Sequence, residues 1–146
     1  MNKSILNIPF IIFIISLISI LVNTISSIYF MSIMMIGIIF LCLRETIKNK
    51  QYYTLGFLIL TMLYLEVNMG FKPFSLTLFA IFSHILIMPY MQRVMSFSNI
   101  SNYVYVAWFY MGSVFVYSLN NDLSLSLFST TFFNILIDFI IIGLFI

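Results

Sequence analysis

The chain has 146 residues, of which 63% are hydrophobic, 18% are aromatic and only 7% are charged. Soluble domains carry about a quarter charged residues, so six Lys and Arg with four Asp and Glu cannot cover a surface that faces water. The composition therefore excludes a soluble domain and indicates a protein embedded in a lipid bilayer. A net charge of +2 carried on so few residues gives no basic patch of the kind that nucleic acid needs, so nucleic-acid binding is also excluded.

The residue types needed for catalysis or for a metal site are nearly missing. The single cysteine allows no internal disulfide, and the one histidine has no acidic residue within four positions. Neither C-x-x-C nor H-E-x-x-H occurs, so the ligand spacings of zinc sites and intramembrane metalloproteases are not present. We therefore expect a protein that is not an enzyme and that has no catalytic residues, no metal and no cofactor.

The first third of the chain predicts two membrane spans joined by a turn. Between Lys3 and Arg44 lie 40 residues without a charge. As one helix they would extend about 60 Å, twice the thickness of the hydrocarbon layer. Short polar side chains compete with a helix for backbone hydrogen bonds, so we place the turn at residues 23–27. The predicted spans are residues 5–22 and 28–43.

The rest of the chain predicts four more spans. A polar loop at residues 44–51 precedes a span at 52–69, and the turn at 70–73 supplies Gly70 and Pro73, which suit a turn and the first turn of a helix. Further spans follow at 74–91, 103–119 and 123–146. The sequence thus predicts an all-α fold: one transmembrane domain over residues 1–146, a polytopic helical bundle of about six spans.

The orientation of this bundle follows from its basic residues, because cytoplasmic loops carry an excess of Lys and Arg. With six spans, five of the six basic residues lie on one side of the membrane and only Lys72 lies on the other. Both termini are therefore expected in the cytoplasm, with the chain as a multi-pass protein of the bacterial inner membrane. The five are Lys3, Arg44, Lys48, Lys50 and Arg93.

Three ionisable side chains fall inside predicted spans, where such groups are costly and are functional candidates by default. Glu66 lies near the outer end of its span, where it could also pair with Lys72 or cap a turn. His84 lies near the middle of its span, where a hydrogen bond to a neighbouring helix is the simpler role. Asp138 lies deep in the last span and is the hardest to explain by packing alone.

Uncharged polar side chains recur at helical spacing and predict which face of each span looks inward. Hydrogen bonds across such faces hold membrane helices together, so ordinary bundle packing is one explanation of the pattern. The polar faces are Ser16, Ser19, Asn23 and Ser26; Thr54, Thr61 and Asn68; Thr77, Ala80 and His84; Tyr103, Tyr110 and Tyr117; and Thr131, Asn134 and Asp138.

The central segment has a Gly-led motif in the third predicted span, residues 56–66, GFLILTMLYLE. Gly70-Phe71 follows in the next turn, and the next span ends in the basic exit Tyr90-Met91-Gln92-Arg93. These features resemble the third-span motif, the next turn and the next span of the rod shape-determining membrane protein MreD family. Asn134 followed by apolar residues also matches. The resemblance covers residues 31–93 and Asn134. It implies a non-enzymatic subunit of the cell-elongation complex that maintains rod shape by binding an MreC-like protein and peptidoglycan synthases.

Two functions remain open. In the first, the bundle is a scaffold in membrane lipid, with Glu66, Asn68 and Asn134 shaping an outward-facing polar site for partner proteins. In the second, the chain is a small-solute carrier, because the fold of the MreD family resembles the solute-binding S-components of energy-coupling-factor transporters. His84, Asp138 and Tyr110 would then line an intramembrane pocket. No G-x-x-x-x-G-K-[ST] occurs, so active transport would need a separate coupling chain.

Overall fold

A computed structural model describes residues 8–28, 33–94, 98–119, 121–122 and 125–145. All regular structure in these residues is helical, which confirms the all-α prediction. The elements are α1 (Pro9–Ile28), α2 (Ile36–Lys48), α3 (Tyr52–Asn68), α4 (Ser75–Phe82), the π-helical turn η2 (Ser83–Ile87), α5 (Met88–Val94), α6 (Ser98–Ser118) and α7 (Leu125–Phe145). Since α4, η2 and α5 follow one another without a break, they form one continuous rod.

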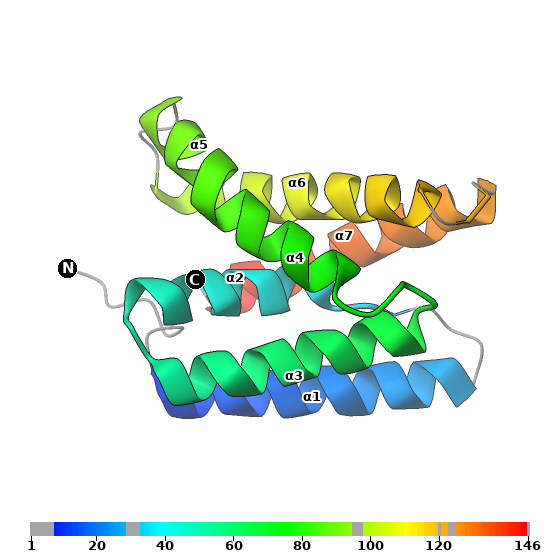
Figure 1. Cartoon of the computed structure of the whole chain (residues 1–146), viewed down its shortest axis with the longest axis horizontal. Coiled ribbons are helices and arrows are strands. Elements are labelled where there is room, and N and C mark those ends of the chain that lie inside the picture. The colour runs from blue at the N-terminus through cyan, green and yellow to red at the C-terminus, as the bar shows by residue number, and fades with distance from the viewer. Residues whose placement is uncertain (1–7, 29–32, 95–97, 120, 123–124, 146) are drawn as a thin grey trace.

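The short helix α2 lies at the centre of the molecule. It packs between α3 and α6, while α1 lies along α3, and α7 packs against α6 (Figure 1). Each residue from Ile36 to Leu43 is buried. Thirteen residues make a helix of about 20 Å, which is shorter than the hydrocarbon layer. The centre of the bundle is thus a helix too short to cross a bilayer alone.

Three helices are long and apolar enough to cross a membrane, namely Pro9–Ile28, Ser75–Val94 and Leu125–Leu144. They have large apolar side chains on their outer faces: on α1 these include Phe10, Leu21 and Ile28, and on α7 Leu125 and Phe132. Such surfaces suit contact with lipid rather than water. The structure thus agrees with the membrane environment that the composition indicates.

The predicted boundaries hold well after residue 50 and fail before it. The spans predicted at 52–69 and 74–91 correspond closely to α3 and to the α4–α5 rod, and that predicted at 123–146 to α7. The span predicted at 103–119 begins five residues earlier, at Ser98. The polar loop predicted at 44–51 is mostly helical, because α2 continues to Lys48.

The turn predicted at residues 23–27 is wrong, since α1 continues through it to Ile28. The hydroxyl groups of Thr24 and Ser27 donate to the carbonyl oxygens of Ile20 and Thr24, at 2.7 and 2.8 Å, inside the same helix. Their polar atoms are satisfied without breaking the helix. The predicted second span, 28–43, is wrong for the same reason: α2 begins only at Ile36.

The predicted polar faces do look inward on the first and last helices. Ser16, Ser19, Asn23 and Ser26 are buried on α1, and Thr131, Asn134 and Asp138 are buried on α7. In the α4–α5 rod, Thr77 and Ala80 are buried, but the π-helical turn leaves His84 only half-buried and places Ser83 inside.

The π-helical turn has a local cause. Pro89 follows it and has no backbone N–H, so the carbonyl of Ile85 loses its usual helical partner. Figure 1 shows the rod crossing the bundle obliquely, with α5 standing away from the other helices. Tyr90 and Val94 on α5 are accordingly exposed.

Candidate functional site

Residues 33–35, directly before α2, approach the bundle interior, where Met35 is buried. Residues 33–35 are non-helical, and Met35 has a positive φ of 52°. Figure 1 shows α2 starting part of the way along α1 and α3 rather than level with their ends. Irregular backbone at membrane depth must find hydrogen-bond partners within the protein. The side chains that supply those partners form the first part of the site.

Two side chains on α7, one helical turn apart, hold this segment. Asn134 Oδ1 accepts a hydrogen bond from the backbone N–H of Met34 at 2.7 Å. Asp138 Oδ2 accepts from the backbone N–H groups of Gly37 and Ile38, at 3.0 and 3.3 Å. These N–H groups belong to the first turn of α2, where a helix leaves them unpaired and where negative charge is favoured. Asp138 therefore caps α2 from a different helix.

A tyrosine completes this cap. The hydroxyl of Tyr110, on α6, donates to Asp138 Oδ2 at 2.8 Å, and both side chains are fully buried. The second carboxylate oxygen, Oδ1, is buried without a hydrogen-bond partner. Gly37 permits the close approach, because a Cβ there would lie 2.6 Å from Asp138 Oδ2. The burial and partners of Asp138 give it a structural role at the centre of the bundle.

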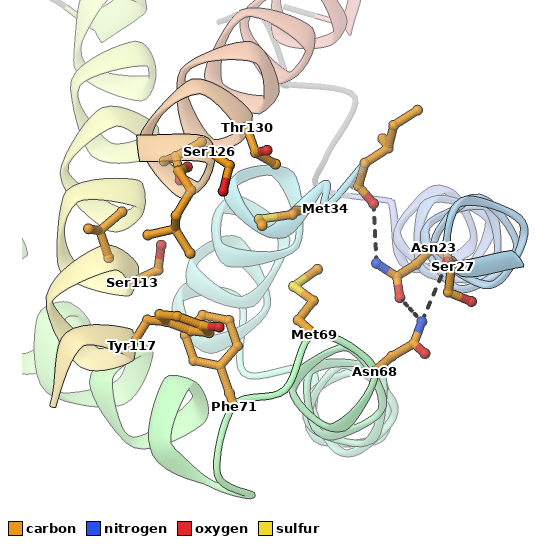
Figure 2. A pocket seen from close by; sticks show the side chains of 14 residues that line it. Asn23, Ser27, Met34, Asn68, Met69, Phe71, Ser113, Tyr117, Ser126 and Thr130 are labelled. Atoms are coloured by element: carbon orange, nitrogen blue, oxygen red, sulfur yellow. Dashed lines mark hydrogen bonds between the residues drawn. The ribbon is translucent and has the colours of Figure 1, made fainter. Parts of the chain in front are cut away.

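On the other side of residues 33–35, two asparagines from neighbouring helices meet. Asn23 Nδ2, on α1, donates to the carbonyl oxygen of Ile33 at 3.1 Å. Asn68 Nδ2, at the end of α3, donates to Asn23 Oδ1, and Figure 2 shows these bonds as dashed lines. The amide pair thus joins α1, α3 and the non-helical segment.

A cavity of about 460 Å³ opens beside this amide pair (Figure 2). Its walls come from the last turns of α1, α3 and α6, the first turns of α7 and the residues before α2. Six hydroxyl side chains line it: Ser27, Ser113, Tyr117, Ser126, Thr130 and Thr131. No lining residue is a carboxylate, an amine, a guanidinium or an imidazole. The cavity falls within the roughly 300–1,000 Å³ of small-molecule sites.

One wall of this cavity is aromatic. The rings of Phe71 and Tyr117 meet edge to face, with centroids 5.4 Å apart. Figure 2 shows Met69 between this aromatic pair and the Asn23–Asn68 amides, and Met34 further up the same side. Methionine side chains are flexible and adapt to irregular ligands. The cavity therefore combines an amide end, a hydroxyl wall and an apolar wall.

Glu66 lies apart from the cavity. It is fully buried, and its Oε1 accepts hydrogen bonds from the backbone N–H and, at 2.6 Å, from the hydroxyl of Thr77 in the first turn of α4. Its Oε2 is buried without a hydrogen-bond partner. Of the two simple roles considered for Glu66, the structure shows the capping role. Among the described residues Arg44 and Glu45 form an ion pair at 3.7 Å, whereas the alternative pairing of Glu66 with Lys72 is not formed.

His84 also stands apart from Asp138 and from the cavity. His84 lies in the π-helical turn. The charged groups that interact electrostatically with it are Arg44 and Glu45, which lie near the opposite end of α2 from Gly37. Its Nδ1 is buried and has no hydrogen-bond partner. The structure joins Tyr110 to Asp138 but does not bring His84 to them. None of the three is among the residues that line the cavity, so this cavity is not the pocket that the carrier hypothesis expects from them.

The five predicted site residues therefore divide into four places. Asn134 and Asp138 hold the start of α2, Asn68 lines the cavity, Glu66 caps α4, and His84 lies in the rod. Sequence reasoning placed Asn23 and Tyr117 on polar faces but did not identify them as site residues. Their position near predicted span ends on the same side as Asn68 is the signal that could have found them.

The lining of the cavity offers hydroxyl and amide groups that can bind a polar molecule, and no Asp, Glu, His, Lys, Arg or Cys is among its residues. No group of three His, Cys, Asp or Glu side chains suited to a metal ion occurs among the residues that the structure describes. No known protein family, curated protein or solved structure matches this chain.

Proposed function

We propose that the chain is a non-catalytic, multi-pass protein of the bacterial inner membrane that binds a small water-soluble solute, as the substrate-binding subunit of a transporter does. The observation that carries the proposal is the 460 Å³ cavity with its uncharged polar lining. A cavity of this size that is lined by hydroxyl and amide groups can offer hydrogen bonds to a small polar solute.

The position of the cavity supports this proposal. Its lining residues lie at the end of the bundle where α1, α3 and α6 finish, whereas Lys48 and Lys50 lie at the opposite end. If basic residues mark the cytoplasmic side, six spans with both termini inside place the cavity toward the outside. A solute would then enter it from the outer face.

The hydrogen bonds around residues 33–35 also support it. Asn23 lines the cavity and is bonded to Ile33, and Asn134 is bonded to Met34, which also lines it. The wall of the cavity is thus held by side chains from α1 and α7. A site whose wall is fixed in advance loses less free energy on binding than one that must be ordered.

The proposal is tested by screening the purified protein, in lipid nanodiscs, against a library of water-soluble metabolites. We expect one or more compounds to raise the unfolding temperature saturably, because a ligand that binds only the folded state stabilises it. Ser113→Leu fills the cavity and should abolish this rise. Ser118→Leu, on the same helix but outside the cavity, is the matched control and should keep it. A screen without any stabilising compound would contradict the proposal.

A scaffold function in the cell-elongation complex is the second proposal, and one observation favours it. Gly56, the first residue of the segment that resembles MreD, is exposed on α3, and no atom lies within 4 Å of a Cβ built there. Small residues on an outer face let a second membrane helix approach closely. A single-span partner such as an MreC-like protein could pack there.

Affinity purification in mild detergent distinguishes the two proposals. Recovery of an MreC-like protein or of peptidoglycan synthases, with loss of that partner in Gly56→Ile, would favour the scaffold. Recovery of an ATPase pair with a coupling subunit would favour solute transport. If neither class of protein is recovered, the scaffold proposal fails, and the nanodisc screen alone decides on solute binding.

A further inference from the structure

We propose that the solute is an uncharged ring compound that carries several N–H or O–H hydrogen-bond donors. This inference rests on the proposed function, because it concerns the same cavity, and it specifies the chemical class of the ligand. Three features of the lining carry it: the absence of a counter-ion, the orientation of the hydroxyl groups and the aromatic wall.

The first feature is charge. None of the side chains that line the cavity is charged. The two buried carboxylates of the bundle, Glu66 and Asp138, are bonded to the first turns of α4 and α2 instead. A charged ligand would therefore lose its water without gaining a partner of opposite charge, which is strongly unfavourable. The cavity selects against both anions and cations.

The second feature is the direction of the hydroxyl protons. Ser113 Oγ donates to the carbonyl of Tyr110 at 2.7 Å, and Thr131 Oγ1 donates to that of Leu127 at 2.8 Å. Ser27 Oγ donates in the same way within α1. A hydroxyl has one proton and two lone pairs, so these three groups offer acceptors to the cavity and no donor. A ligand with several N–H or O–H groups would satisfy them.

The third feature is the aromatic wall. The Tyr117 ring forms it together with Phe71, and Figure 2 shows its hydroxyl directed toward the cavity. Aromatic faces pack well against flat or ring-shaped groups and bury much apolar surface. Opposite them, the amide pair of Asn23 and Asn68 supplies further polar groups. A ring with donors at its edge matches both walls.

The test compares matched derivatives of the same ring in the nanodisc assay. Adenosine, uridine and glucose are the neutral probes. Each is measured beside three derivatives. The phosphate ester adds negative charge, the amino-substituted derivative adds positive charge, and the O-methylated form removes hydrogen-bond donors. If a neutral probe binds, its derivatives should bind at least about ten-fold more weakly. The charged forms find no counter-ion in the cavity, and the methylated form has lost its hydrogen-bond donors.

A pair of serine variants examines the acceptor assignment. Ser113 and Ser118 both donate to the carbonyl three residues earlier on α6, each at 2.7 Å, but only Ser113 lines the cavity. Ser113→Ala should weaken binding of the neutral compound about five-fold, which corresponds to the loss of one hydrogen bond. Ser118→Ala should leave the affinity unchanged.

The outcomes separate this inference from the proposed function. If the metabolite screen finds a solute that is charged or has no donors, or if an O-methylated form binds as tightly as its parent, the inference is wrong while solute binding stands. Equal affinity in Ser113→Ala and wild type would also contradict it. If no compound of any class binds, both the inference and the proposed function fail.

Discussion

At the scale of single residues, Gly37 shows how closely the centre of the bundle is packed. The α2 backbone comes near enough to α7 and α6 that a Cβ at Gly37 would lie 2.6 Å from both Asp138 Oδ2 and Val106 Cγ1, and 3.0 Å from the Tyr110 ring. All three neighbours are themselves buried. Only a residue without a side chain allows Asp138 to reach the first turn of α2.

We therefore expect Gly37→Ala to destabilise the protein. Overpacking of a filled core costs about 1–3 kcal/mol, which exceeds the gain of up to about 1 kcal/mol from the higher helix propensity of alanine. The measurement is the unfolding temperature in mild detergent. Gly56→Ala is the control, because nothing lies within 4 Å of its Cβ, and it should be neutral or slightly stabilising. Equal unfolding temperatures for the two variants would contradict the packing argument.

The polar residues that the sequence marks as candidates do not share one role. Asp138 and Glu66 each accept hydrogen bonds at the start of another helix, a role that depends on which helices are neighbours. Asn68 reaches the cavity because α3 ends beside α1. The sequence correctly selects polar groups that need a partner, but it contains no information on which partner each one finds.

At the scale of helices, α4 depends on a cap from α3. Its N-cap residue, Phe74, has a positive φ of 69° and makes no side-chain cap hydrogen bond. Glu66 supplies the missing acceptor by bonding to the N–H and hydroxyl of Thr77. The turn between α3 and α4 is thereby closed by a side chain from the helix that precedes it.

Replacing Glu66 tests this cap. Glu66→Ala should lower the stability by about 0.5–2 kcal/mol, the usual value of an N-cap, and Glu66→Gln should lower it less because an acceptor oxygen remains. The unfolding temperature in detergent measures both. Asp122→Ala is the comparison, since Asp122 is exposed and the replacement of an exposed residue changes the stability by no more than about 0.5 kcal/mol. A Glu66→Ala protein as stable as wild type would argue against the cap.

The connection from α1 to α2 shows where helix prediction fails. Asn23, Thr24 and Ser27 are typical turn residues, but here they lie inside α1 and bond to carbonyl groups or to other helices. The non-helical backbone lies later, at residues 33–35, where the residues Ile, Met and Met are apolar. Their polar partners are on α1 and α7, so no local pattern could reveal the break.

At the scale of the whole molecule, the arrangement of six rods suggests six membrane crossings. Three of them meet the length and hydropathy expected of a span. α2 is too short by itself, and α3 has only 17 residues. Six crossings with both termini in the cytoplasm are the arrangement that we propose, because that arrangement places the basic residues on one side.

Cysteine labelling tests this topology. Cys42 is fully buried, so wild-type protein should react poorly with a membrane-impermeant maleimide in intact cells. Asn49 and Asp122 are both exposed and are separated by α3, the α4–α5 rod and α6. We expect Asp122→Cys to react from outside and Asn49→Cys to react only after the membrane is permeabilised. Labelling of both from the same side would show that the number of crossings between them is even.

The sequence by itself determined that this protein is helical and suited to a membrane, where four of its helices lie to within a few residues, and which faces of the first and last helices are polar. These properties follow from composition and from periodicity along one helix. The tertiary structure alone decided where α2 begins, which helices Asp138 and Glu66 cap, and that Asn23, Asn68 and Tyr117 surround one cavity. These features join residues 11 to about 100 positions apart, and such contacts depend on helix packing rather than on local sequence.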